Sequence, residues 1–88
     1  MNTDDICDRY ADEKVGIVLR LLTDEDGIAR TVLAEGRPTA LKMLGELLIA
    51  VADGKSGESF HISPFGPGNI HFDTKSELGI YIHRIEQT

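Results

Sequence analysis

Apolar and polar residues alternate along the segment that begins at Lys14, as on a strand that buries one face. The alternating apolar positions are Val15, Ile17, Leu19 and Leu21. Residues 23–27 (Thr-Asp-Glu-Asp-Gly) are turn formers, and their final glycine can adopt a positive φ. Residues 28–34 then resume a strand-like mixture. The pattern therefore predicts a β-hairpin over residues 14–34.

Helical periodicity replaces the alternation after residue 37. Pro38 suits a first helical position, and Gly54 suits the left-handed residue that ends a helix, so we expect a helix over residues 38–53. Its predicted sheet-facing residues are Ala40, Leu41, Leu44, Leu47, Leu48 and Val51. Its predicted polar sector contains Lys42, Glu46 and Asp53. Ile49 falls within that polar sector and is predicted to be exposed, either as an ordinary surface residue or as an anchor for a dimer or partner.

The last third of the chain predicts short strands joined by turns. A polar linker over residues 55–58 leads to a strand over 59–63. Prolines and glycines make residues 64–69 a loop, with Phe65 at or near the surface. A strand over 70–72, a turn over 73–76 and a strand over 77–85 follow. Ile85 breaks the alternation of the last strand, which predicts a bulge near His83 or an edge position.

These elements predict an α+β fold. Residues 1–13 form an acidic N-terminal arm or a short helix, in which Thr3 caps a helix that carries Ile6 and Tyr10 on one face. Residues 14–88 form a single α+β domain, in the order strand, strand, helix, strand, strand, strand. We expect two layers: an antiparallel sheet of four to five strands, with one main helix packed on one face.

The charge balance narrows the choice of partners. Among 88 residues, 15 are Asp or Glu and 9 are Lys or Arg, for a net charge of −6. Because nucleic-acid surfaces need clustered Lys and Arg, we expect no nucleic-acid partner. The acidic turn Asp24-Glu25-Asp26 is either a solvated face or a field that speeds encounter with a cationic protein. Without a signal-peptide pattern, a long apolar run or a second cysteine beside Cys7, we expect a cytoplasmic protein with no membrane contact.

Three histidines are the strongest candidates for chemistry. His61, His71 and His83 each sit beside apolar residues on predicted strands, so their rings are expected on the outer face of the sheet. Three imidazoles there, with Asp73 near His71, would form a zinc site with an open position. The chain lacks an HExxH or paired-cysteine signature, and Cys7 lies among acids that raise its pKa. We therefore expect no catalytic residue and no cofactor.

One set of motifs resembles a known family. Gly36 precedes the helix, Gly54 follows it, and the segments Phe60-His61-Ile62 and residues 76–82 (SELGIYI) close the pattern. The leucines of that helix are Leu41, Leu44, Leu47 and Leu48. Over about residues 28–86 this arrangement is similar to the small immunity proteins of bacterial polymorphic toxin systems, immunity family thirty-two. The resemblance implies a cytosolic protein that neutralises a cognate toxin by covering it, and the acidic balance suits a basic nuclease-like toxin.

Three hypotheses follow. The first is a non-catalytic protein-binding module, in its narrower form an immunity protein, which contacts its partner through Ile49, Phe65 and the acidic turn Asp24-Glu25-Asp26. The second is a homodimeric structural or regulatory domain joined through a sheet edge or through Ile49. The third is a metal-dependent enzyme that uses His61, His71 and His83.

Overall fold

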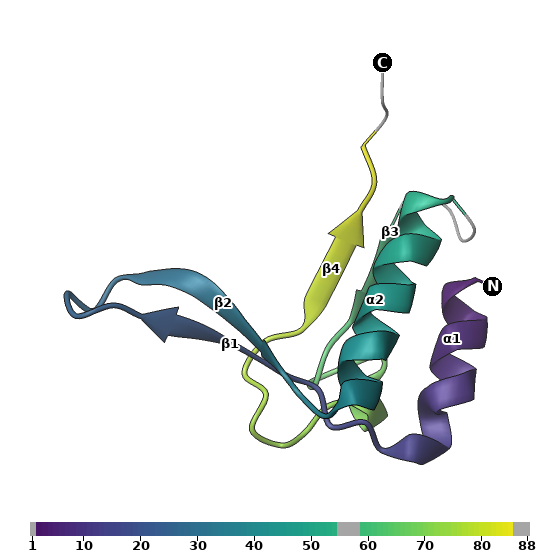
Figure 1. Cartoon of the computed structure of the whole chain (residues 1–88), viewed down its shortest axis with the longest axis horizontal. Coiled ribbons are helices and arrows are strands. Elements are labelled where there is room, and N and C mark those ends of the chain that lie inside the picture. Colours follow the sequence, from purple (N-terminus) through teal and green to yellow (C-terminus); the bar gives the residue numbers. More distant parts are fainter. Residues whose placement is uncertain (1, 55–58, 86–88) are drawn as a thin grey trace.

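The computed structural model describes residues 2–54 and 59–85, which leaves the predicted linker 55–58 outside the described residues. The described chain is α+β, as predicted, with two α-helices and two antiparallel sheets of two strands each (Figure 1). One sheet pairs β1 (Val18–Thr23) with β2 (Ala29–Glu35). The other pairs β3 (Ser59–Ile62) with β4 (Ile80–His83). The described residues thus form two small sheets rather than the predicted single sheet of four to five strands.

The N-terminal segment forms the helix α1 (Thr3–Tyr10), which is the short helix of the two predicted alternatives. Its cap is Asn2 rather than Thr3: the Asn2 side chain accepts a hydrogen bond from the Asp5 N–H at 2.8 Å, and the Asp5 carboxylate accepts one from the Asn2 N–H. Ile6 and Tyr10 lie four residues apart and are both buried. A short 3₁₀ turn, η1 (Ala11–Glu13), then leads toward the first sheet.

The predicted hairpin is present, but its strands begin later than expected. Val15 and Ile17 are buried as extended chain before β1, and Ile17 makes a single parallel bridge to Phe72. In β1 and β2, Leu19 lies opposite Ala34 and Leu21 lies opposite Val32. Figure 1 shows the hairpin projecting away from the helices and the second sheet. We call its projecting part, residues 20–33, the arm.

The helix α2 (Pro38–Ala52) begins at its predicted residue and ends one residue before its predicted end, with Gly54 in the left-handed conformation at φ 71°. Its buried residues are Ala40, Met43, Leu44, Leu47, Ala50 and Val51. Leu41 and Leu48 were predicted to face the sheet, but they are 47% and 49% exposed. The buried face is rotated because α1 packs beside α2, so that part of α2 covers a helix as well as a sheet.

The C-terminal segment differs from its predicted strands between residues 69 and 72. Asn69–His71 form a 3₁₀ turn, η2, in place of a strand, because Gly68 at φ 77° turns the chain and its carbonyl accepts a hydrogen bond from His71 N–H at 3.0 Å. A Cβ on Gly68 would lie 2.4 Å from Ile62 Cγ2, so the close approach also requires glycine. β4 ends at His83, two residues earlier than predicted.

Hydrogen bonds from irregular chain, rather than a shared ladder, connect the two sheets. The Ile17 N–H donates to the His71 carbonyl at 2.9 Å, and the Leu19 carbonyl accepts from the N–H groups of Glu77 and Leu78. The buried Ser76 hydroxyl accepts from the Leu19 N–H at 2.9 Å. This segment occupies the edge of β1 near its start, which is why the described strands do not merge into one sheet.

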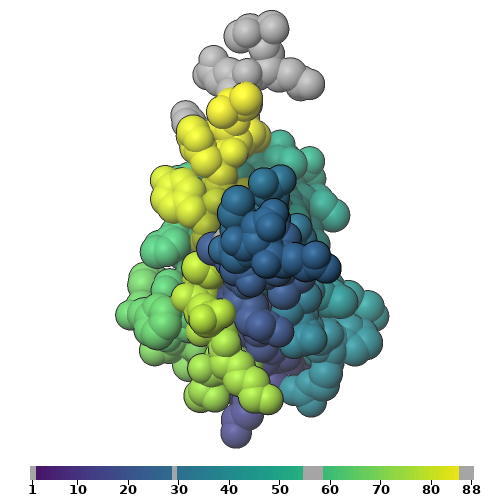
Figure 2. Space-filling view, turned by 90° about the vertical axis from the view of Figure 1, so that its left-hand side faces the viewer, coloured from purple at the N-terminus to yellow at the C-terminus, as the bar shows by residue number. Residues whose placement is uncertain are grey.

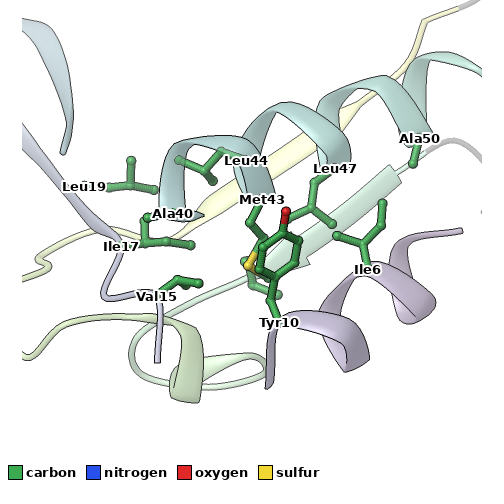
Figure 3. Packing of buried hydrophobic residues seen from close by; sticks show 11 residues of the cluster. Ile6, Tyr10, Val15, Ile17, Leu19, Ala40, Met43, Leu44, Leu47 and Ala50 are labelled. Atoms are coloured by element: carbon green, nitrogen blue, oxygen red, sulfur yellow. The ribbon is translucent and has the colours of Figure 1, made fainter. Parts of the chain in front are cut away.

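The core lies where α1, α2, the start of β1 and the second sheet meet (Figure 3). Ile17, Met43 and Leu47 are fully buried, and Figure 3 shows Met43 close to the ring of Tyr10. The alternation predicted for the second sheet is confirmed, because its inner face packs on this core and its outer face is exposed. The inner-face residues are Phe60, Ile62, Ile80 and Ile82.

Candidate protein-docking surface

The arm carries large apolar side chains that nothing in the described chain covers. The exposed fractions are 49% for Leu21, 38% for Leu22, 48% for Ile28 and 60% for Val32. Leu21 and Val32 lie opposite each other on the two strands. They share a sheet face with Leu19, which lies two residues before Leu21 and is buried in the core. In Figure 2 the arm points toward the viewer, with β4 on one side and α2 on the other. The arm thus extends an apolar sheet face beyond the reach of the helices.

The acidic turn lies at the tip of the arm and is well ordered by hydrogen bonds. One carboxylate oxygen of Asp24 accepts hydrogen bonds from the N–H groups of Asp26 and Ile28, both at 3.0 Å. The other oxygen lies 3.5 Å from the Arg30 guanidinium in an exposed ion pair. Glu25 and Asp26 are exposed beside it. The turn predicted from the sequence is confirmed, and its charges lie next to the apolar part of the arm.

The outer side of α2 presents a second apolar surface. Ile49 is 62% exposed, as predicted, and it lies beside the exposed Leu41 and Leu48. Gly45 lies between these residues on the same side, with nothing within 4 Å of the place where its Cβ would be. Glu46, predicted to face solvent, has a side chain that is 37% exposed and that also accepts hydrogen bonds from Tyr10 (2.5 Å) and from Arg9.

The contacts of Glu46 explain how α1 is held on α2. Hydrogen bonds from Arg9 first, and then from Tyr10, lower the pKa of Glu46. The same hydrogen bond to Glu46 raises the pKa of the Tyr10 hydroxyl. The Arg9 guanidinium also lies 4.9 Å from the centre of the Tyr10 ring, within range of a cation–π contact. The contacts among Arg9, Tyr10 and Glu46 hold α1 against α2.

Phe65 is 81% exposed on the loop between β3 and η2, in agreement with its predicted surface position. The loop is closed by a hydrogen bond from the Ser63 N–H to the Pro67 carbonyl at 2.8 Å. Phe65 borders a hollow of about 310 Å³, whose other lining residues are Pro64, Asn69, Phe72, Asp73, Thr74 and Ser76. The predicted contact residues therefore lie on three different elements: the tip of the arm, the outer side of α2 and this loop.

The three histidines do not form the predicted site. His71 is 3% exposed and lies on η2, so its ring is inside the molecule rather than on the outer face. His61 is exposed on β3, with its ring 5.9 Å from that of Tyr81, and His83 is exposed on β4. Among residues 2–54 and 59–85, no three side chains of His, Cys, Asp or Glu are grouped so as to hold a metal ion. The zinc-site hypothesis was wrong in placing His71 on a strand.

His71 and Cys7 are titratable groups affected by burial. Burial lowers the pKa of His71 from its ordinary value of 6.5, and its Nδ1 has no hydrogen-bond partner among the described groups. Burial, followed by the charges of Asp4 and Asp8, raises the pKa of the Cys7 thiol. A raised pKa leaves little thiolate at neutral pH, so Cys7 is a poor nucleophile.

A hollow of about 490 Å³ beside η1 offers no paired groups for acid–base chemistry. Its lining residues are Ala11, Lys14, Gly16, Ile70, Phe72, Asp73 and Thr74. Of these, Lys14 and Asp73 are the ionisable ones, and one Asp73 oxygen already accepts a hydrogen bond from the Lys75 N–H at 2.8 Å. The arm is therefore the feature of the described chain that departs most from an ordinary surface.

Sequence reasoning missed the apolar residues of the arm as a candidate site. Leu21, Leu22 and Val32 were interpreted as parts of strands that a helix would cover. A usable signal was present, because Leu21 and Leu22 are adjacent and must point to opposite faces, whereas one helix can cover only one face.

Comparisons with protein-family models, with curated proteins and with solved structures find no match to this chain. No helix in the described ranges combines the length and apolar character that crossing a membrane requires.

Proposed function

We propose that this chain is a non-catalytic protein-binding module whose arm is the main contact surface. The observation that carries the proposal is the 60% exposure of Val32 beside the half-exposed Leu21 on a projecting hairpin. Exposed apolar patches rimmed by polar residues are typical of protein-binding surfaces. The acidic turn at the tip supplies such a rim and favours a partner, or a part of a partner, that carries positive charge.

Contact with another chain would also remedy a weakness of the arm. A two-stranded hairpin is marginally stable in water unless further strands or a packed layer support it. The inner face of β3–β4 has that support from α1 and α2, whereas the exposed Leu21 and Val32 show that the arm lacks it. A partner that covers the arm would gain apolar burial at about 25 cal/mol for each Å² removed from water.

A photoreactive residue placed in the arm tests this function. Val32 and Ile70 are both 60% exposed, so p-benzoylphenylalanine at position 32 has a matched control at position 70. Irradiation of cells that produce each variant should give a protein adduct of discrete mass from position 32 and none from position 70. Equal labelling at the two positions, or no adduct at position 32, would contradict the proposal.

The immunity role is a narrower form of the same proposal. The resemblance to immunity family thirty-two and the net charge of −6 support a basic toxin as the partner, and such a role is expected in the cytoplasm. Producing the chain together with a toxin-like product of the adjacent upstream gene should then restore growth. Val32→Lys should abolish the rescue and Ile70→Lys should preserve it. Failure of the unaltered chain to rescue would remove the immunity role and leave the binding module standing.

A further inference from the structure

The outer edge of β2 is open for strand pairing. Within the described residues, β2 pairs only with β1, from Val18 opposite Glu35 to Thr23 opposite Ala29. A register shift between Leu22 and Thr23 leaves Arg30 without a directly opposite residue on β1. The edge of β1, by contrast, is partly occupied near Leu19 by the segment that carries Ser76. An open apolar edge strand is a template for a further strand, so β2 is the available side of the arm.

The strand β2 is also complementary to a second copy of itself. In an antiparallel pair related by a two-fold axis, residues opposite each other share a face, so the axis passes through one residue position. Only a centre at Val32 pairs all seven residues of β2, which spans Ala29–Glu35. Arg30 then lies opposite Ala34 and Thr31 opposite Leu33, so no like charges face each other.

The same register brings opposite charges together beyond the strand ends. When this register is continued past Ala29, the acidic turn Asp24-Glu25-Asp26 of one copy approaches Arg37 of the second copy. Arg37 lies at the N-terminus of α2. The first turn of α2 contains no acidic residue and its cap residue makes no side-chain capping bond, so negative charge from outside would be stabilising there. The acidic turn thus has a counterpart on the second copy.

We propose that two copies of this chain pair through β2, antiparallel and centred on Val32, to form a four-stranded sheet in the order β1–β2–β2–β1. This inference rests on the proposed protein-binding function and names a second copy as the partner. The dimer places Leu21 and Val32 of each copy in one continuous apolar row across the sheet.

Engineered cysteines test the register directly. Directly opposite residues of antiparallel strands have Cα atoms about 4.5–5.5 Å apart. That distance falls within the range of about 4.4–6.8 Å that a disulfide spans. In a Cys7→Ser background, Val32→Cys should therefore form a covalent dimer under mild oxidation, detected on a non-reducing gel. Leu22→Cys, also exposed on the arm, is the matched control: its two copies would lie about three strand spacings apart, roughly 14 Å, and should not join.

Mass measurements on the unlinked protein provide the second readout. Sedimentation equilibrium of the unaltered chain should give twice the chain mass at high micromolar concentration. Val32→Lys should weaken the dimer at least tenfold, because two like charges would meet at the axis. Ile49→Glu should leave it unchanged, because α2's outer side is not part of the pairing.

Each contrary outcome overturns a defined part of the argument. A single-chain mass at all concentrations, or equal disulfide yields from positions 22 and 32, excludes this dimer. A dimer that Ile49→Glu breaks and Val32→Lys spares would assign the contact to α2 instead. A single-chain mass together with a photo-adduct to a different protein would exclude the dimer and retain the binding module. A single-chain mass together with no photo-adduct at position 32 would exclude both the dimer and the binding module.

Discussion

The two sheets of this protein follow the same alternation and have opposite surroundings. In β3 and β4 the inner face lies on the core beneath α1 and α2, and Ile62 is 3% exposed. In the arm the equivalent apolar row runs from the buried Leu19 to Leu21 and Val32, which are in solvent. Alternation thus indicates which face of a strand is apolar, but not what covers that face. An apolar face left uncovered within the chain is where we expect a second chain.

The largest expected effect compares two leucines of β1 that share a face. Leu19 is 4% exposed and Leu21 is 49% exposed. Leu19→Ala should lower the free energy of unfolding by about 2–5 kcal/mol, because it leaves a cavity in the core. Leu21→Ala should change it by no more than about 0.5 kcal/mol under dilute conditions, where the arm has no partner. Urea unfolding measures both, and similar losses for the two variants would show that the arm is covered within the single chain.

The next effect compares two glycines that have the same backbone conformation. Gly27 at the tip of the arm and Gly68 beside β3 both have φ 77°. Gly27→Ala should cost about 1 kcal/mol, the left-handed penalty alone, because nothing lies within 4 Å of its Cβ position. Gly68→Ala adds an overlap with Ile62 and should cost more than about 2 kcal/mol. Thermal unfolding ranks the two variants, and an equal cost would mean that the loop after β3 can move away from Ile62.

Much of the covered region was predictable from the sequence because its signals are local. Pro38 and Gly54 marked the ends of α2, and the alternation of Phe60, Ile62, Ile80 and Ile82 indicated the inner face of the second sheet. The rotation of α2 was not predictable in the same way. Leu41 and Leu48 point outward because a second helix takes up part of the burial, and the sequence left the choice between a helix and a loose arm open for residues 1–13.

Of the candidate site, the sequence predicted individual exposed residues but not the surface that they belong to. Ile49 stood out because it falls in the polar sector of the helix, and Phe65 because it lies in a loop of prolines and glycines; both are exposed. Placing His71 required the path of residues 68–72, which depends on the packing of Gly68 against Ile62, a contact made by the tertiary fold. The arm was missed because strand patterns carry no information on how far the covering helices extend.

A smaller effect tests whether the hydrogen bond between Tyr10 of α1 and Glu46 of α2 contributes to stability. Tyr10→Phe removes the hydroxyl that donates to Glu46 at 2.5 Å but keeps the buried ring. Loss of this hydrogen bond should lower the free energy of unfolding by about 1 kcal/mol. Tyr81→Phe, which alters an exposed tyrosine on the outer face of the second sheet, is the control and should have almost no effect. Equal effects would indicate that the hydrogen bond between Tyr10 and Glu46 contributes nothing to stability.

The smallest expected effect is a dependence of stability on pH that arises in the covered region. All ionisable residues of the arm are exposed, whereas His71 is buried with a pKa lowered from 6.5. Below that ordinary value the unfolded chain binds the proton more readily than the folded chain, so the free energy of unfolding should fall as the pH drops. Glu46, whose pKa is lowered from 4.5, should add a further loss only at more acidic pH.

Variants of two histidines isolate this contribution. Urea unfolding repeated from about pH 7 to about pH 5, the range in which an ordinary histidine titrates, should show the decline in the unaltered chain and a flatter profile in His71→Gln. His61→Gln, on the exposed face of β3, should keep the decline of the unaltered chain. The comparison uses the slope rather than the absolute stability, so it holds even if His71→Gln weakens the fold. A decline that persists in His71→Gln and disappears in His61→Gln would place the titrating group on the outer face of the second sheet. It would contradict the assignment of the pH dependence to the buried His71.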